Sequence, residues 1–365
     1  MGARGQVGRL GELVIAGFDG PTLPARFERA LRDGRLGGAI LFKRNVGGGP
    51  AQVAALARAI HAASPRPLLG VDQEGGRVTR LRAPLLEVPP MRAVAGIGDV
   101  AFAERAARAV GMELAALGFT VDFAPVLDVN TCAHNPVIGD RAFGDDAATC
   151  AAFGAAWIRG LQSSGLLACG KHFPGHGDTS KDSHFDLPVV DQPRERIERI
   201  ELAPFRAAVA ADVASLMTAH VVYPALDAER PATLSPAVCT ALRGELGFRG
   251  LLVSDDLEMR AVAACWSIEE SAVLAVAAGC DALLVCEHEE LRERAVDALE
   301  REAGRSPTFQ VRCDEALGRV HAARARATAR PAPDDEALAR AIGSAESRAV
   351  AGELARRAAR SGGAS

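Results

Sequence analysis

The segment LLACGKHFPGHGDTSKDSHFDLP (residues 166–188) changes from apolar to polar at its sixth residue. Its beginning, LLACG, holds small and apolar residues, which is typical of a buried strand in a parallel sheet. The part that follows, from Lys171 to Pro188, holds three histidines, three aspartates and two lysines. Titratable side chains just after a buried strand are typical of the active-site face of an α/β barrel.

Similar apolar runs recur along the chain, and Ala-rich stretches of helical character separate them. Strands are predicted at 13–18, 38–43, 68–72, 121–128, 166–171, 215–220, 251–255 and 282–286. Helices are predicted between them, for example at 101–117, 147–164, 196–211 and 267–278. Eight strands that alternate with helices predict an α/β fold with a single closed (β/α)8 barrel of the TIM type. An open doubly wound sheet is the alternative, but the chain lacks a Gly-rich dinucleotide loop.

The chain is expected to form one catalytic barrel over residues 1–330. Residues 331–365 are expected to form a helical extension that packs on the barrel, with a frayed tail at SGGAS. From about residue 306 onward, the pattern predicts two further helices joined by the segment ARPAPDD.

Composition excludes several classes of protein. With a formal net charge of -4, the 365-residue chain lacks the basic field that nucleic-acid binding requires. No apolar run approaches the ~18 residues of a membrane helix, and we expect no secretory leader. The eight cysteines are scattered without a CxxC pair, which is typical of reduced core residues. We therefore expect a cytoplasmic protein that binds neither nucleic acid nor membranes.

Polar residues fall repeatedly at the ends of the predicted strands. They are Asp72, Asp128, Lys171, His172, His220 and Asp255. Because the carboxyl ends of barrel strands converge on one face, these side chains should meet where the βα loops build an active site. A random scatter of charges would not select that end repeatedly, so the pattern favours an enzyme.

His172 and His176 stand four residues apart, which is also the spacing of a zinc-binding helix. Pro174 and Gly175 lie between them and disfavour a helix, and the glutamate of a zinc helix is missing. The segment instead predicts a loop over about 173–192, and loops of that length are usually functional or disordered. We therefore predict no metal site and no cofactor.

Within that loop, Asp182 and His184 stand two residues apart, so an extended backbone places their side chains on the same side. The carboxylate can then fix the tautomer of the imidazole and stabilise the imidazolium. The other ring nitrogen is left to give or take a proton near neutral pH. The alternative is a solvated loop histidine without a task.

The segment after the third strand carries Asp72 beside Arg77 and Arg80. A carboxylate and a guanidinium together can hydrogen-bond vicinal hydroxyls or an amide of a sugar. The alternative is a tight Gly-Gly turn with no further role.

Two later segments also offer charged groups. Arg141 follows the fourth strand, where it could serve a site or pair at the surface with Asp140 or Asp145. Asp255, directly at the end of the seventh strand, is expected to face the barrel mouth as a nucleophile or electrostatic stabiliser. Strand alternation predicts that Asp256 points the other way and serves a helix cap.

Four segments together, KHFPGHGDTSKDSH, VDQEGGRVTR, VIGDRAFG and VSDDLEM, resemble the glycoside hydrolase family 3 β-N-acetylhexosaminidases in order and spacing. The resemblance covers about residues 13–300, and the K-H-F-P-G-H-G-x4-D-S-H run is its most specific part. It implies a nucleophile at Asp255 and an acid/base at His184 with Asp182 as its partner. It implies sugar-binding residues at Asp72, Arg80, Arg141, Lys171 and His172. Larger family members take the acid/base from a second domain, for which we expect no room after this barrel.

The resemblance further implies a retaining hydrolysis that removes a terminal β-linked N-acetylglucosamine from a small carbohydrate, without metal or cofactor. The implied substrate is an N-acetylglucosaminyl-1,6-anhydro-N-acetylmuramyl peptide of cell-wall recycling. With aromatics at 4%, a short pocket for one sugar fits better than a platform for polysaccharide. Two alternatives stay open. One is a phosphorylase, because no second carboxylate is expected near the site to repel an incoming phosphate. The other is a sugar-binding protein without activity.

Overall fold

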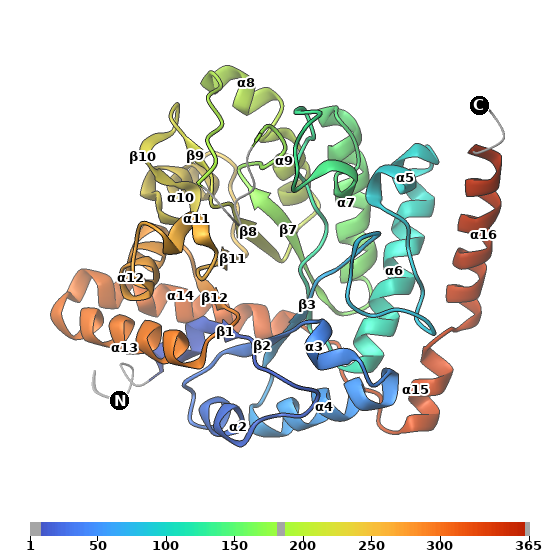
Figure 1. The fold of residues 1–365 in the computed structure, drawn as a ribbon, viewed down its shortest axis with the longest axis horizontal. Coiled ribbons are helices and arrows are strands. Elements are labelled where there is room, and N and C mark those ends of the chain that lie inside the picture. Colours follow the sequence, from blue (N-terminus) through green and yellow to red (C-terminus); the bar gives the residue numbers. More distant parts are fainter. Residues whose placement is uncertain (1–8, 181–186, 362–365) are drawn as a thin grey trace.

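The computed structural model of the protein describes residues 9–180 and 187–361. Eight parallel strands form a closed barrel in the order β1-β12-β11-β8-β7-β6-β3-β2, and helices surround it (Figure 1). The strands are β1 (Val14–Ala16), β2 (Gly38–Leu41), β3 (Leu68–Val71), β6 (Val121–Asp122), β7 (Leu167–Phe173), β8 (Ser215–Thr218), β11 (Leu251–Asp256) and β12 (Ala282–Val285). The predicted (β/α)8 barrel is confirmed, and each predicted strand region overlaps one of these strands.

The other elements connect the barrel strands or lie outside them. The helices are α2 (Ala25–Arg32), α3 (Lys43–Val46), α4 (Pro50–Ala63), α5 (Met91–Gly96), α6 (Val100–Leu117), α7 (Ala147–Gln162), α8 (Arg194–Arg199), α9 (Ala203–Ala210), α10 (Pro236–Gly244), α11 (Arg260–Ala263), α12 (Ile268–Ala278), α13 (Glu289–Arg305), α14 (Pro307–Arg326), α15 (Asp335–Ala341) and α16 (Ala345–Ser361). Short 3-10 turns are η1 (Leu10–Leu13), η2 (Gly139–Arg141) and η3 (Ala232–Leu234). Two small antiparallel hairpins pair β4 (Gln73–Gly75) with β5 (Val78–Thr79), and β9 (Val222–Tyr223) with β10 (Asp227–Pro231).

The barrel strands are apolar because they are covered on both faces. All residues of β1, β2 and β3 are buried, as expected where helices pack outside a parallel barrel and side chains fill its interior. This packing requires a residue without a side chain at position 70, because a Cβ on Gly70 would come within 2.5 Å of the Phe123 ring.

Proline shortens two of the predicted elements. The expected strand 121–128 ends at Asp122, since Pro125 has no N–H for the ladder. Beyond it, an isolated bridge pairs Val126 with Lys171. The expected helix 196–211 is two helices, α8 and α9, because Pro204 lies in the first turn of α9, where its missing N–H costs nothing.

The C-terminal part contains three helices, α14, α15 and α16, where the sequence predicted two. Gly343, with a φ of +61°, lies in the turn that separates α15 from α16. The last two helices contact α6 at the outer edge of the barrel (Figure 1). There Glu113 on α6 accepts a hydrogen bond from Gly343 N at 2.9 Å, and Arg108 pairs with Glu346 at 3.2 Å. The division into a barrel over 1–330 and an extension over 331–365 stays a prediction.

Two findings concern the whole described chain. None of its helices, over residues 9–180 and 187–361, is long and apolar enough to cross a membrane. All eight cysteines lie within these ranges, and none of them forms a disulfide.

Candidate active site

A pocket of about 320 Å³ opens where the barrel strands end. Six of the site residues expected from the sequence line it together: Asp72, Arg80, Arg141, Lys171, His172 and Asp255. The other two, Asp182 and His184, lie outside the described residues. The pocket therefore gathers the strand-end groups of β3, β7 and β11 with the loop that carries Arg141.

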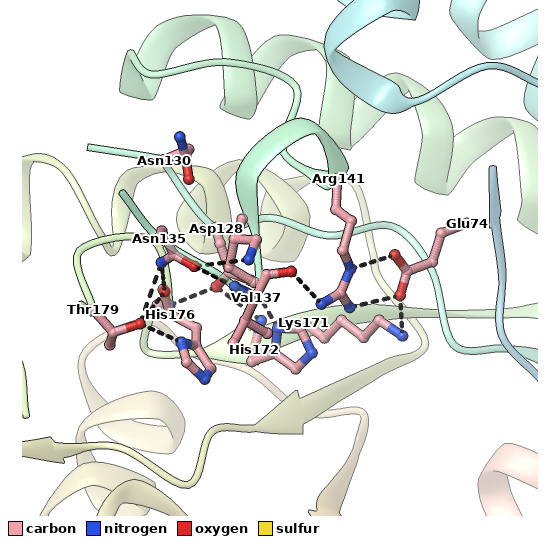
Figure 2. A network of polar contacts seen from close by, with 12 residues as sticks. Glu74, Asp128, Asn130, Asn135, Val137, Arg141, Lys171, His172, His176 and Thr179 are labelled. Carbon is pink, nitrogen blue, oxygen red and sulfur yellow. Dashed lines mark hydrogen bonds and ion pairs between the residues drawn. The ribbon is translucent and has the colours of Figure 1, made fainter. Parts of the chain in front are cut away.

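Two carboxylates hold the three cations of the pocket in place. Glu74 accepts two hydrogen bonds from Arg141, at 2.8 and 2.9 Å, and lies 2.6 Å from Lys171 Nζ (Figure 2). Asp72 accepts from the same ammonium at 2.8 Å and from Arg80 at 3.2 Å. The two carboxylates stand two residues apart where the chain enters the extended strand β4, so both can face the same side.

The charges in this network stabilise one another. Burial would raise the pKa of Glu74, but Arg141 and Lys171 hold that pKa far below its usual range. Burial would lower the pKa of Lys171, but Asp72 and Glu74 raise it above its usual value. Both groups are therefore ionised at neutral pH and joined by charge-assisted hydrogen bonds, which are short and directional.

Asp128, which is fully buried, fixes the start of the loop after β7. Its Oδ2 lies 2.7 Å from His172 Nδ1, and its Oδ1 accepts from the backbone N–H groups of His172 (3.1 Å) and His176 (2.7 Å). Burial would raise the pKa of Asp128, but the two histidines lower it, so the carboxylate stays charged. A charged acceptor at Nδ1 makes this nitrogen the donor and sets the orientation of the His172 ring.

His176 also lines the pocket, and its contacts fix the position of its ring. Its Nδ1 lies 2.8 Å from Thr179 Oγ1, and its carbonyl accepts from Asn135 Nδ2 at 2.8 Å (Figure 2). Burial, together with the neighbouring His172, lowers the pKa of His176 to about 4. The ring is therefore uncharged at neutral pH.

The HFPGH segment is not a helix, because His172 belongs to β7 and His176 lies in the loop that follows. The rings of His172 and His176 lie 5.8 Å apart between centroids and meet at 75°. Over residues 9–180 and 187–361, no group of three or more His, Cys, Asp or Glu side chains is placed to hold a metal ion.

Strand β11 ends in two aspartates that both line the pocket. The expectation that Asp256 points away is wrong. The register between β11 and β12 shifts between Val253 and Asp256, so simple alternation of side chains does not apply there. The expected helix cap is also wrong, because the N-cap of α11 is Met259 and Asp256 Oδ1 accepts from Glu258 N at 3.1 Å. A second carboxylate therefore lies beside Asp255, contrary to the argument that favoured a phosphorylase.

The surroundings separate the acidities of these two carboxyl groups. Burial would raise the pKa of Asp255, but His220 and His172 lower it below its usual value. Burial raises the pKa of Asp256 to about 7, and the charges of Glu258 and Asp255 add to the effect. At neutral pH, Asp255 is ionised while Asp256 is about half protonated. Such a divergence between adjacent carboxyls is common in active sites.

Arg141 is part of the pocket and not of a surface pair. The alternative partners expected from the sequence are used by other arginines: Asp140 lies 3.4 Å from Arg77, and Asp145 lies 3.6 Å from Arg92. Arg141 itself is bound by Glu74, whose side chain is only 1% exposed.

Sequence reasoning gave no specific role to four residues that form or support the pocket, although it expected Asp128 at the active-site face: Glu74, Asp128, His176 and Asp256. A signal existed for two of them. Glu74 follows Asp72 at the spacing of one face of a strand, and Asp128 stands at a predicted strand end. His176 was considered only as a zinc ligand.

Comparison with known proteins identifies the family of the chain. The profile of the glycosyl hydrolase family 3 N-terminal domain matches residues 9–323. A β-hexosaminidase of Thiobacillus denitrificans is 45% identical over 280 residues, which cover 74% of this chain and 77% of the relative. Among solved structures, a family 3 β-N-acetylglucosaminidase of Paenibacillus sp. str. FPU-7 aligns with a TM-score of 0.86 and 39% identity, covering 96% of this chain and 68% of that one.

NagZ of Neisseria gonorrhoeae in complex with N-trifluoroacetyl-D-glucosamine aligns with a TM-score of 0.79 and 31% identity, covering 95% of this chain and 98% of that one. The same Neisseria protein has been solved in complex with zinc ion. The resemblance noted in the sequence is thus confirmed: the chain belongs to glycoside hydrolase family 3 and is a β-hexosaminidase-like hydrolase of that family.

Proposed function

We propose that the enzyme is a retaining β-N-acetylglucosaminidase that removes a terminal non-reducing N-acetylglucosamine by double displacement. The observation that carries this proposal is the ionised carboxylate of Asp255, which lines the sugar-sized pocket at the end of β11. A nucleophile must be charged to attack an anomeric carbon, and the imidazoles around Asp255 keep it so. The relatives named β-hexosaminidase and β-N-acetylglucosaminidase support the same activity.

In the proposed first step, Asp255 forms a bond to the anomeric carbon as the glycosidic C–O bond breaks. The His184 imidazolium gives its proton to the departing oxygen, and Asp182 stabilises the imidazolium. In the second step, neutral His184 takes a proton from water, and the water oxygen displaces Asp255 from the same face. The configuration is retained, although a histidine replaces the carboxylic acid of the usual pair. The support for this dyad is the family resemblance of the DSH segment.

We assign the binding of the sugar to Asp72, Arg80, Arg141, Lys171 and His172. Carboxylate, ammonium and guanidinium groups suit hydroxyl and amide recognition, and here they are held by one another before the sugar arrives. The volume of about 320 Å³ is near the lower end of small-ligand pockets, which span about 300–1,000 Å³. This size supports a single sugar in the pocket.

For the physiological substrate we propose a muropeptide, N-acetylglucosaminyl-1,6-anhydro-N-acetylmuramyl peptide, cleaved in the cytoplasm during cell-wall recycling. This step rests on analogy with the family. Water is favoured over phosphate as the acceptor, because an ionised Asp256 beside Asp255 would repel an incoming phosphate dianion.

The test combines turnover with trapping. A chromogenic N-acetylglucosaminide should be hydrolysed, and a mechanism-based fluorosugar should label Asp255, as peptide mass spectrometry can show. NMR should show the β-anomer of N-acetylglucosamine as the first product. Labelling of Asp256, or the α-anomer first, would overturn the mechanism. Formation of N-acetylglucosamine 1-phosphate in phosphate buffer would establish the phosphorylase instead.

A further inference from the structure

His220 lies behind the carboxylates of β11 and has no assigned role. It follows β8, is 1% exposed, and is not among the described residues that line the pocket. Its Nε2 lies 2.8 Å from the carbonyl oxygen of Asp256. Because a carbonyl only accepts, Nε2 carries the hydrogen and donates it to Asp256. The ring is therefore attached to the last residue of β11.

The other side of the ring is attached to a buried hydroxyl. His220 Nδ1 lies 2.8 Å from Thr233 Oγ1, and Thr233 is fully buried in η3. That hydroxyl also lies 2.9 Å from Thr218 Oγ1 and 3.1 Å from the carbonyl oxygen of Ala219. The imidazole thus connects the end of β8 and the turn η3 to the end of β11, and the contacts around the Thr233 hydroxyl are buried.

Asp256 transmits this attachment to the neighbouring carboxylate. The Asp256 N–H donates to Asp255 Oδ1 at 2.8 Å, while the Asp256 carbonyl accepts from His220. One residue backbone therefore holds the proposed nucleophile on one side and the imidazole on the other. A shift of that backbone would rotate the Asp255 carboxylate relative to the pocket, and misplacement of about 1 Å can reduce a rate ~100-fold.

Charge provides a second connection between His220 and Asp255. His220 is the largest of the groups that lower the pKa of Asp255 against the effect of burial, followed by His172. Lys171 on β7 lowers it as well, and Asp256, His176 and Cys286 are further titratable groups of the pocket that interact with Asp255. His220 is not among the described residues that line the pocket, so we expect its effect on the reaction to pass through Asp255.

We propose that His220 is a positioning residue that holds the end of β11 through Asp256 and so aims the Asp255 carboxylate into the pocket. The proposal rests on the proposed role of Asp255 as nucleophile. It assigns the imidazole two tasks: its Nε2–H fixes the backbone, and its ring places positive potential beside the carboxylate.

Two substitutions separate these tasks. The amide of His220→Gln can still reach the Asp256 carbonyl, whereas that of His220→Asn replaces only Nδ1 and reaches Thr233. We expect kcat to fall about tenfold or more in His220→Asn and less in His220→Gln, with KM changed less than about twofold. Both variants lose the ring, so the acid limb of kcat/KM should move to higher pH by about one unit.

The chain offers matched controls. His61 on α4 also binds a backbone carbonyl, that of Gly118 at 2.8 Å, but lies outside the barrel. His61→Asn should leave kcat and the acid limb unchanged. Thr233→Val should repeat part of the His220→Asn effect, whereas Thr233→Ser keeps the hydroxyl and should keep the activity of the unaltered enzyme. This pair tests the proposal even if a His220 variant folds poorly.

Fluorosugar trapping distinguishes a failure of this inference from a failure of the proposed function. Slow labelling of Asp255 in His220→Asn supports the positioning role. Labelling at the wild-type rate, or an unchanged acid limb with only a lower melting temperature, would show that His220 has a structural role alone. Absence of label on Asp255 in the unaltered enzyme would instead overturn the proposed nucleophile.

Discussion

The carboxylate of Glu74 lies 2.6 Å from the ammonium of Lys171, and both side chains are almost fully buried, at 1% and 3% exposed. Glu74 also holds Arg141 through two hydrogen bonds. Lys171 and Arg141, two of the cations assigned to sugar binding, thus share the Glu74 carboxylate as a counter-ion. Glu74 holds both of them in position at the pocket.

The first prediction is that Glu74→Gln impairs both folding and binding. It leaves Arg141 without its carboxylate and Lys171 with Asp72 alone, and breaking a buried pair typically costs about 3–5 kcal/mol. We expect a loss of this order in urea unfolding, together with an increased KM. Glu87→Gln is the control, because Glu87 pairs with Arg82 at 2.9 Å where both side chains are about half exposed. Its effect should stay below about 1 kcal/mol. Similar losses in both variants would contradict the role given to Glu74.

The second prediction concerns pH and Asp256. Its pKa is raised from 3.8 to about 7 by burial first and by Glu258 and Asp255 next. The folded state therefore keeps a proton that the unfolded chain loses near pH 4. The stabilising contribution is fully present below that point and is lost as the pH rises to about 7. Asp256→Asn cannot lose a proton, so it should gain stability relative to the unaltered enzyme between pH 5 and pH 8.

Asp255→Asn serves as the control of opposite sign. Burial raises and the imidazoles lower the pKa of Asp255, with a net decrease. Its contribution to stability is therefore present above the unfolded pKa and is lost as the pH falls. Unfolding free energies measured at several pH values should show opposite trends for the two variants. Parallel trends would mean that the two carboxyls do not differ in acidity.

The third prediction is that activity survives a chelator. The segment that carries His172 and His176 is not helical, and among residues 9–180 and 187–361 no group of three or more His, Cys, Asp or Glu side chains is placed to hold a metal ion. The assay should compare dialysed enzyme with and without added zinc, since the Neisseria relative has been solved with zinc ion. Activity that is lost on dialysis and restored by zinc would refute the metal-free site.

Much of the fold is predictable because barrel strands are marked by local composition. Buried parallel strands need apolar residues on both faces, and runs such as 282–286 show this without any tertiary information. Two of the errors occurred at prolines. Pro125 and Pro204 interrupt elements whose apolar pattern continues past them, so the pattern alone gives elements that are too long.

The candidate site is predictable only in part, for topological reasons. Strand ends meet on one face in every such barrel, which brings Asp72, Lys171 and Asp255 together. The pairing of Arg141 with Glu74 depends on the path of two loops, and local spacing favours Asp140 or Asp145 instead. The position of Asp256 depends on the register shift between β11 and β12, which no property of the SDDLEM segment reveals.

The last prediction concerns His184, the proposed acid/base. His184→Ala should affect glycosides with poor leaving groups far more than activated aryl glycosides, because an activated leaving group needs little protonation. With activated substrates the first step should largely survive, while the second lacks its base. The glycosyl-enzyme should then accumulate, and stopped-flow measurements should show a burst of aglycone followed by slow turnover.

Two variants calibrate this result. Asp182→Asn keeps the shape of the partner but loses the charge that favours imidazolium, so it should give a milder form of the same pattern. His134→Ala removes an exposed histidine of the loop after β6 and should leave both substrate classes unaffected. Equal losses on poor and activated leaving groups in His184→Ala would count against the proposal. A residue that only binds the sugar affects both classes alike, so that result would make His184 a binding residue. The proton donor would then be another group of the pocket. Asp256 would be the first to test, because its pKa of about 7 suits proton transfer near neutrality.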